Sequence, residues 1–223
     1  MAAPRKKAGK AAASSGLAAN LAKPRAVQKP SREEVHEAIR TLIRWTGDDP
    51  TREGLLETPD RVARAWEEMS TGYQEDPVEF LKSTFEEIAD YDEMVILRDI
   101  RVESHCEHHL MPIVGRVHIA YLPQKRVVGI SKLARLIEVF SKRLQIQEKL
   151  TAQIAGSLNT VLKPRGVGVI VQAVHHCMTT RGVHKTGVEM VTSQMLGAFR
   201  DDSRTRREFL SIVQGPAANP RDG

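Results

Sequence analysis

Residues 94–123 read MVILRDIRVESHCEHHLMPIVGRVHIAYLP, and this stretch holds two segments rich in β-branched residues, MVILRDIRVES and RVHIAYLP. Apolar and polar residues roughly alternate in both, which is typical of strands with one buried face. The segment CEHHLMPIVG between them contains a cysteine and two adjacent histidines. The pattern predicts an antiparallel pair of strands whose connecting loop, residues 106–115, carries reactive side chains.

A second pair of strands is expected in VGVIVQAVHHCM, residues 167–178, and VTSQMLGAF, residues 191–199. Between the two pairs, apolar residues recur at helical intervals after Ser131, which we expect to cap a helix, and again from about Gln147. Two hairpins separated by a helical pair favour an α+β fold, in which an antiparallel four-stranded sheet has the two helices on one face. A last helix is expected in residues 203–213.

Two further helices are expected ahead of the sheet. Ser31 and Glu34 have the spacing of a capping box, and Thr58 opens a second helical pattern with Pro59 in its first turn. The chain then divides into four parts: a basic tail at 1–30, a helical region at 31–90, a catalytic domain at 91–214 and a short C-terminal tail at 215–223.

The positive charge of the chain lies in the tail. The 223 residues carry a net charge of +5, yet residues 1–30 hold seven basic residues and no acidic one, which leaves 26 basic against 28 acidic residues after them. Nucleic-acid-binding modules spread positive charge over the folded body, so we expect no nucleic-acid partner. Because the tail has almost no large apolar residues, we expect it to be disordered, and an organelle-targeting segment is the alternative.

The cellular location follows from what the sequence lacks. It contains no run of about 18 apolar residues, the length of a membrane-spanning helix, and no apolar core of a secretory signal near its start. We therefore expect a cytoplasmic protein that does not bind membranes.

The two cysteines of the chain, Cys106 and Cys177, both have histidines nearby. Two thiolates and one imidazole would give three protein ligands, the number found in catalytic zinc sites that keep one position open for water. Adjacent side chains diverge, so one of His108 and His109 is expected to bind the metal and the other to face the substrate. His175 precedes Cys177 by two positions on an expected strand, which would put both on one side and make His175 a candidate proton donor.

Separate buried cysteines and surface histidines are the alternative, because the sequence has no CxxC pair. We favour this alternative, a surface histidine, for three other residues that the chemistry does not require: His105, His118 and His176.

A possible anion site lies in GISKLAR, residues 129–135. A helix start with Ser131, Lys132 and Arg135 offers backbone N–H groups, a hydroxyl and two cations, which suit phosphates. Gln147, Glu148 and Arg181 carry no signal of their own, since an acidic residue at a helix start is equally explained by the helix dipole.

Four segments together resemble the zinc-dependent GTP cyclohydrolase I family, over about residues 33–213: CEHHLMPIVGRVHIAYLP, VVGISKLARLIEVFSKRLQIQEKLT, AVHHCMTTRGV and TSQMLGAF. The resemblance implies the tunnelling fold, with zinc ligands at Cys106, His109 and Cys177. It implies proton-handling histidines at His108 and His175. It also implies triphosphate contacts from Ser131, Lys132, Arg135 and Arg181, and guanine recognition by Glu148 with Gln147 beside it.

The reaction implied by this resemblance converts GTP and water to 7,8-dihydroneopterin triphosphate and formate, the first step of pterin biosynthesis, toward folate or tetrahydrobiopterin. The resemblance also implies a homodecamer with active sites between subunits. Other enzymes of the same fold group, such as pterin synthases and nitrile reductases, lack this ligand set. A structural zinc module with a nucleic-acid-binding tail is the alternative from another class, and it predicts a fourth protein ligand.

Overall fold

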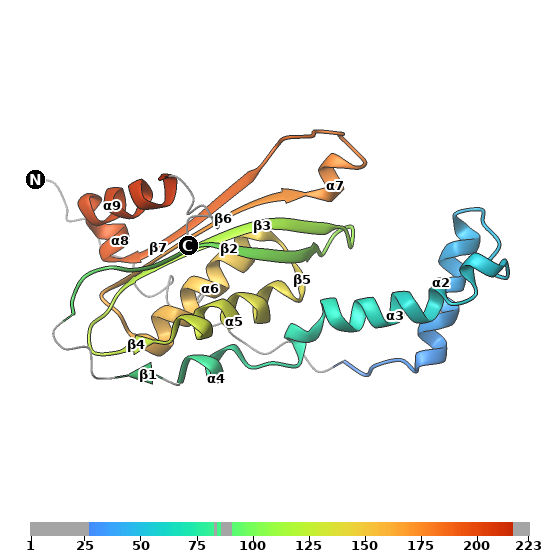
Figure 1. Cartoon of the computed structure of the whole chain (residues 1–223), viewed down its shortest axis with the longest axis horizontal. Helices are drawn as coiled ribbons and strands as arrows, with labels where there is room; N and C mark the ends of the chain where they lie inside the picture. The colour runs from blue at the N-terminus through green and yellow to red at the C-terminus, as the bar shows by residue number, and fades with distance from the viewer. Residues whose placement is uncertain (1–26, 83, 86–90, 216–223) are drawn as a thin grey trace, which may run out of the picture.

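The computed structural model describes residues 27–82, 84–85 and 91–215. The expected basic tail therefore lies almost entirely outside the described residues, as does most of the C-terminal tail. The first two predicted helices are confirmed as α2 (Arg32–Trp45) and α3 (Thr58–Met69), which pack against each other and extend away from the body (Figure 1). The capping box is present, because the Ser31 hydroxyl accepts from the Glu34 N–H while the Glu34 carboxylate accepts from the Ser31 N–H at 2.8 Å.

Short elements join these helices to the body. They are η1 (Glu53–Leu55), η2 (Thr71–Tyr73), α4 (Pro77–Lys82) and β1 (Thr84–Phe85). Strand β1 pairs with β4 (Val127–Val128) in a separate two-stranded sheet.

The main sheet contains four long antiparallel strands, as the sequence predicts. They are β2 (Val95–Cys106), β3 (Pro112–Leu122), β6 (Gly166–His175) and β7 (Met190–Gly197). The predicted count of four is nevertheless wrong for the sheet as a whole, since β5 (Leu144–Gln145) pairs in parallel with the end of β2 and gives the order β5-β2-β3-β6-β7. The sheet is thus five-stranded and mixed.

Strand β3 begins four residues earlier than the predicted strand at residues 116–123. The sequence PIVG contains a proline and a glycine and resembles a loop, but it pairs with both β2 and β6. Gly115 fits here because a Cβ atom at this position would lie 2.0 Å from the carbonyl oxygen of Gln172 on β6. The reactive loop is therefore only five residues long, 107–111.

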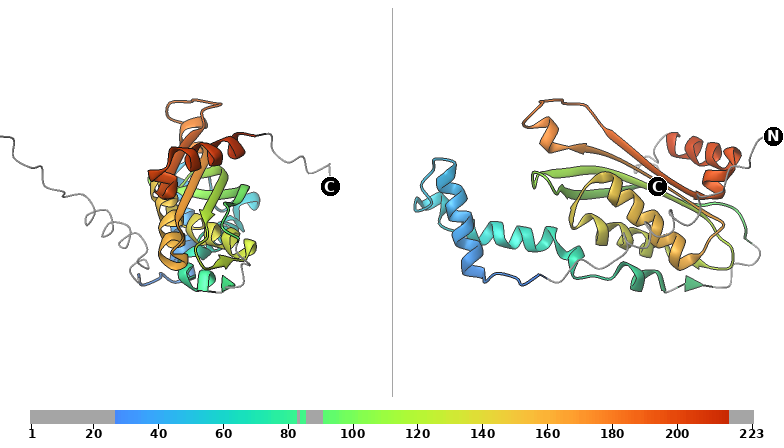
Figure 2. Two further views of the ribbon diagram at one scale, coloured as in Figure 1. Left: turned by 90° about the vertical axis from the view of Figure 1, so that its left-hand side faces the viewer. Right: turned by 180° about the vertical axis from the view of Figure 1, so that it is seen from behind.

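One face of the sheet is covered by α5 (Ile130–Ser141) and α6 (Gln147–Leu162), the predicted helical pair (Figure 2). Their apolar faces pack against the strands in the main core, which includes Val117, Ile119, Leu136, Phe140, Ile154, Leu158 and Val169. Ser131 does not cap α5 as expected. Because the Lys132 N–H already bonds to the Gly129 carbonyl at 2.8 Å, the helix begins at Ile130 and Ser131 is its second residue.

The opposite face is covered at one end by α8 (Ala198–Asp201) and α9 (Ser203–Gln214) (Figure 2). Helix α9 confirms the last predicted helix. The rings of Phe199 and Phe209 meet edge to face at 5.5 Å and pack against Ala120 and Ile170 of the sheet. None of the helices in the described part of the chain is long and apolar enough to cross a membrane.

Strand β6 ends earlier than predicted, and the difference concerns a candidate site residue. Its ladder with β3 stops at the pair Ile113 and His175, so residues further on have no partner strand there. The chain turns instead into the short helix α7 (His176–Thr179), in which the Thr180 N–H bonds to the His176 carbonyl. The expectation that His175 and Cys177 share one side of an extended segment is therefore wrong.

Candidate active site

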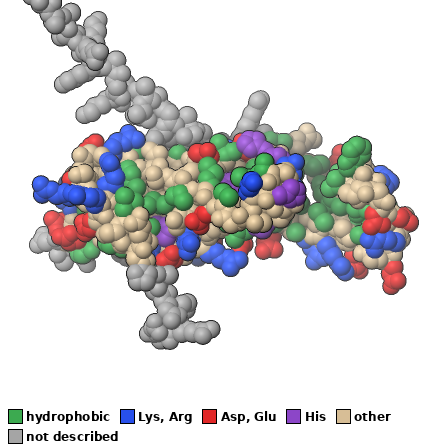
Figure 3. Space-filling model, turned by 90° about the horizontal axis from the view of Figure 1, so that it is seen from above, with side chains coloured by type: hydrophobic (Ala, Val, Ile, Leu, Met, Phe, Trp, Pro, Cys, Tyr) green, Lys and Arg blue, Asp and Glu red, His purple; other side chains and the backbone are tan. Residues whose placement is uncertain are grey.

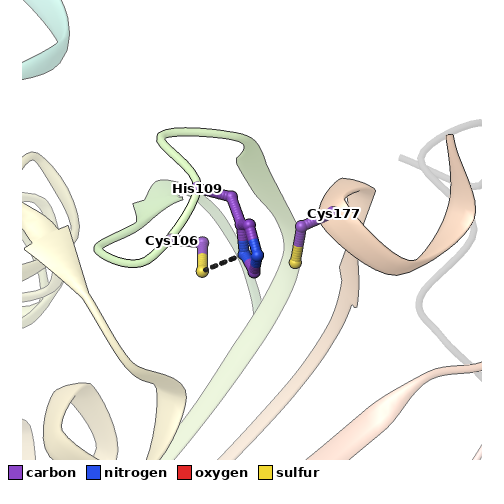
Figure 4. A group of neighbouring side chains, drawn as sticks. All are labelled: Cys106, His109 and Cys177. Atoms are coloured by element: carbon purple, nitrogen blue, oxygen red, sulfur yellow. Dashed lines mark hydrogen bonds between the residues drawn. The ribbon is translucent and has the colours of Figure 1, made fainter. Parts of the chain in front are cut away.

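Three potential metal ligands converge at the end of the sheet where α7 lies. The sulfur atoms of Cys106 and Cys177 and a ring nitrogen of His109 all lie within 4.8 Å of one another (Figure 4). Cys106 is the last residue of β2, His109 is in the loop after it, and Cys177 is in α7. The loop is closed by backbone bonds from Cys106 N–H to Met111 and from Leu110 N–H to Cys106, both 2.9 Å long.

The geometry and the donor atoms fit zinc. In a tetrahedral site with bonds of about 2.3 Å to sulfur and about 2.0 Å to nitrogen, a sulfur and a nitrogen ligand are separated by about 3.5 Å. The Sγ atom of Cys106 lies 3.9 Å from Nδ1 of His109. Thiolate and imidazole are ligands that zinc prefers, and His109 is exposed, so the group opens toward solvent.

His108 also approaches the metal group but does not complete it. Its Nδ1 atom lies 3.8 Å from the Cys106 sulfur, and its ring stands edge-on to that of His109 at 6.3 Å. Among the described residues, His109 is the histidine that joins both cysteines. The structure thus distinguishes His109 from His108 as the candidate metal ligand, a choice that the number of ligands alone leaves open.

His175 lies beside this group, at the end of β6. Its Nε2 atom is 2.8 Å from Oε1 of Gln147, which places the start of α6 next to this histidine. Burial lowers the pKa of the His175 imidazole from its ordinary value, and the nearby charge of Glu148 opposes the shift. Burial raises the pKa of the Cys177 thiol and Cys106 raises it further, while the charge of Arg181 opposes both. Glu148 and Arg181 therefore lie at this end of the sheet.

Three of the four expected phosphate-binding residues, all of them on α5, are not brought to this end. Helix α5 follows β4, which follows the Leu122 end of β3, whereas the metal loop precedes the Pro112 end. At about 3.4 Å per residue, the 11 residues of β3 span roughly 35 Å. Figure 1 shows β4 and α7 at opposite ends of the sheet. The start of α5 carries Ser131, Lys132 and Arg135.

The side chain of Gln147 is turned into the protein rather than toward solvent. It is buried, and its Nε2 atom donates to the carbonyls of Val171 and Met190. This arrangement does not favour the expected guanine contact from this side chain. Helical spacing could have indicated the burial, because Gln147 lies on the same face as the buried Leu150 and Ile154.

Two of the histidines that the chemistry does not require make packing contacts, and the surface position expected for His118 is wrong. His118 is buried on β3, where Nδ1 accepts from the Asp99 N–H at 3.2 Å and Nε2 lies 3.1 Å from Oε1 of Gln172. The ring of His105 lies 5.1 Å from that of Trp66 on α3. On the surface, histidine side chains gather at the α7 end of the body (Figure 3).

An α+β domain that brings two thiols and an imidazole together, with a further histidine nearby, has the donor set of a metal-dependent enzyme of the hydrolytic class. Comparison with known proteins shows to which enzyme family the chain belongs. The family described as GTP cyclohydrolase I matches residues 35–214. The chain therefore belongs to the GTP cyclohydrolase I family, and it has the GTP cyclohydrolase I function in pterin biosynthesis.

Two relatives are similar over most of their length. A GTP cyclohydrolase 1 of Maricaulis maris (strain MCS10) is 57% identical over 83% of this chain and 91% of its own. A GTP cyclohydrolase 1 of Hyphomonas neptunium (strain ATCC 15444) is 51% identical over 86% of this chain and 94% of its own. Among solved structures, an archaeosine synthase QueF-Like in the apo form matches 48% of this chain and 97% of its own, with 20% identity and a TM-score of 0.39.

Proposed function

We propose that the chain converts GTP and water to 7,8-dihydroneopterin triphosphate and formate, with a zinc ion held by Cys106, His109 and Cys177. The observation that carries the proposal is the convergence of these three donor atoms within 4.8 Å, with His175 and Glu148 at the same end of the sheet. When bound in such a site, zinc supplies a Lewis acid that activates water near neutral pH.

His175 and His108 are the groups that move protons in this proposal. His175 donates a proton to the purine nitrogen next to carbon 8, which makes that carbon more electrophilic toward water. After the ring opens and formate leaves, the ribose rearranges and closes onto the freed amines. His108 is exposed beside the Cys106 sulfur, and we assign to it the proton transfers around the sugar.

Glu148 and Arg181 bind the two ends of the substrate. The Glu148 carboxylate is exposed at the first turn of α6, where it can accept from both the ring N–H and the exocyclic amine of guanine. Adenine offers no such pair of donors, so this contact discriminates between the purines. Arg181 is exposed shortly after Cys177, and we assign it to the triphosphate.

A second copy of the chain supplies the remaining phosphate contacts. Ser131, Lys132 and Arg135 lie in the first half of α5, which starts beyond the Leu122 end of β3, whereas the metal group lies at the Pro112 end, so one GTP molecule is not expected to reach both within one chain. The proposal therefore includes a homo-oligomer with active sites between subunits, of the decameric tunnelling-fold type, in the cytoplasm. Neither a membrane nor a nucleic acid is part of it.

The test uses the purified zinc-loaded protein incubated with GTP. Formate is measured together with the fluorescence of oxidised neopterin, and equal amounts of both are expected. Removing zinc with a chelator should stop both, and adding zinc should restore them. A zinc-containing protein that releases no formate would contradict the proposal and favour a structural zinc module instead.

A further inference from the structure

The carboxamide of Gln147 can adopt only one orientation. The side chain is 1% exposed, and its Nε2 atom lies 3.0 Å from the carbonyl oxygen of Val171 and 2.9 Å from that of Met190. Carbonyl oxygens only accept hydrogen bonds, so the nitrogen of the amide must face them. The flipped amide would set its oxygen against two other oxygens, and the ambiguity that usually attends glutamine side chains does not arise here.

This orientation decides which nitrogen of His175 carries a proton. Oε1 of Gln147 faces Nε2 of His175 at 2.8 Å. An amide oxygen has no proton to give, so Nε2 must be the donor. In the neutral imidazole, Nδ1 then holds the lone pair, and no residue in the described part of the chain hydrogen-bonds to that atom.

A buried polar network holds Gln147 in place from three elements. Thr192 on β7 lies 3.2 Å from Nε2 of Gln147 and 2.7 Å from the hydroxyl of Thr151, which in turn donates to the Gln147 carbonyl at 2.7 Å. Every hydrogen in this chain of contacts has an acceptor. Burying polar groups is costly unless their hydrogen bonds are made, so a complete network of this kind resists rearrangement.

We propose that Gln147 is a positioning residue that fixes the tautomer and the ring orientation of His175, so that Nδ1 is the atom that takes up a proton from water and then passes it to the substrate. This inference rests on the role proposed above for His175. A carboxylate in the same place would orient the ring as well, but it would also add a negative charge beside it. The amide of Gln147 orients the ring without that charge.

The kinetic test compares two matched glutamine substitutions on α6. Gln147→Met keeps the side-chain volume but removes the acceptor that faces His175. Gln153→Met makes the same exchange at a buried glutamine whose Oε1 accepts from Gln145 instead. In zinc-loaded protein, Gln147→Met should lower kcat on the order of 10- to 100-fold with little change in KM for GTP or in zinc content, because a misplaced proton donor affects the chemical step. Gln153→Met should keep the parent kcat within about twofold.

The tautomer itself is read from ¹⁵N solid-state NMR spectra of protein labelled at histidine, recorded at about pH 8, above the ordinary histidine pKa of about 6.5. A His175→Asn variant identifies the His175 signals by difference. The parent protein and Gln153→Met should show a protonated Nε2 and an unprotonated Nδ1 at His175, and Gln147→Met should show a mixture.

Two outcomes would overturn the inference. One is a spectrum of the parent protein in which Nδ1 of His175 carries the proton, and the other is a Gln147→Met variant that keeps both the kcat and the His175 tautomer of the parent protein. If Gln147→Met fails to fold, the spectrum of the parent protein still decides. A His175→Asn variant that releases formate at the parent rate would instead contradict the proposed role of His175. The tautomer observed in the parent protein would still stand in that case.

Discussion

The Sγ atom of Cys106 lies 3.9 Å from Nδ1 of His109, while His108 approaches the same sulfur at 3.8 Å. Distance to one sulfur therefore does not identify the metal ligand. What separates the two histidines is the second cysteine, since the His109 nitrogen lies within 4.8 Å of both sulfurs. A site built this way depends on the position of α7 relative to the loop after β2.

Substitution of the two histidines should separate metal binding from catalysis. His109→Asn is expected to reduce the zinc content from about one ion per chain to nearly none, because only two protein ligands remain. His108→Asn should keep zinc and lose most of the activity. Zinc is measured by elemental analysis after dialysis, with Cys177→Ser as the reference for loss of a ligand. Equal zinc in the two histidine variants would show that the assignment is wrong.

Glu148→Ala should weaken GTP binding. Hydrogen bonds to a charged group contribute about 1.5–3 kcal/mol, so the KM for GTP is expected to rise roughly 10- to 100-fold. Glu138→Ala, which removes an exposed carboxylate from α5, is the matched control and should leave KM unchanged. Steady-state formate release gives both constants, and an unaltered KM in the Glu148 variant would remove this residue from the guanine site.

Mixed oligomers test whether the active site combines two copies. Lys132→Ala and His175→Ala damage opposite ends of the sheet, and each alone should be nearly inactive. Unfolding and refolding the two together should restore activity at about one quarter of the sites, the fraction in which both contributing subunits have an intact part. A chain that carries both substitutions, mixed with itself, should recover nothing. If mixed oligomers of the two variants form but stay inactive, all the residues that bind one GTP molecule belong to one subunit.

The buried His118 should stabilise the fold without affecting the chemistry. His118→Phe leaves the Asp99 N–H and the Gln172 Oε1 without their partner, and a loss of about 2–4 kcal/mol in the free energy of unfolding is expected. His118→Asn can still accept from the Asp99 N–H and should lose less. Denaturant unfolding at one fixed protein concentration measures both. A Phe variant as stable as the parent would show that these contacts contribute nothing.

Local patterns predicted the elements that local interactions define. The capping box of Ser31 and Glu34 lies within four residues, so α2 could be placed from the sequence. Strand β5 has two residues and exists only because it meets the end of β2, which no local pattern indicates. The end of β6 likewise depends on where β3 begins, and this is why Cys177 is found in a helix.

The part of the site that is built from rare residue types could be predicted from the sequence. With two cysteines in the chain, each beside histidines, their convergence could be anticipated, and the structure brings them together. The choice between His108 and His109 could not be made from the residues, because it depends on the path of a five-residue loop. The contact between Gln147 and His175 joins positions 28 apart and needed the packing of α6 against the sheet.

The length of β3 has a consequence for how the protein behaves at low concentration. If GTP is bound by the metal end of one copy and the phosphate end of another, a separated subunit keeps its zinc but has no complete place for the nucleotide. The turnover per chain would then fall on dilution while the zinc content per chain stayed constant. A subunit with a damaged site would also inactivate the active site that it shares with an intact neighbour.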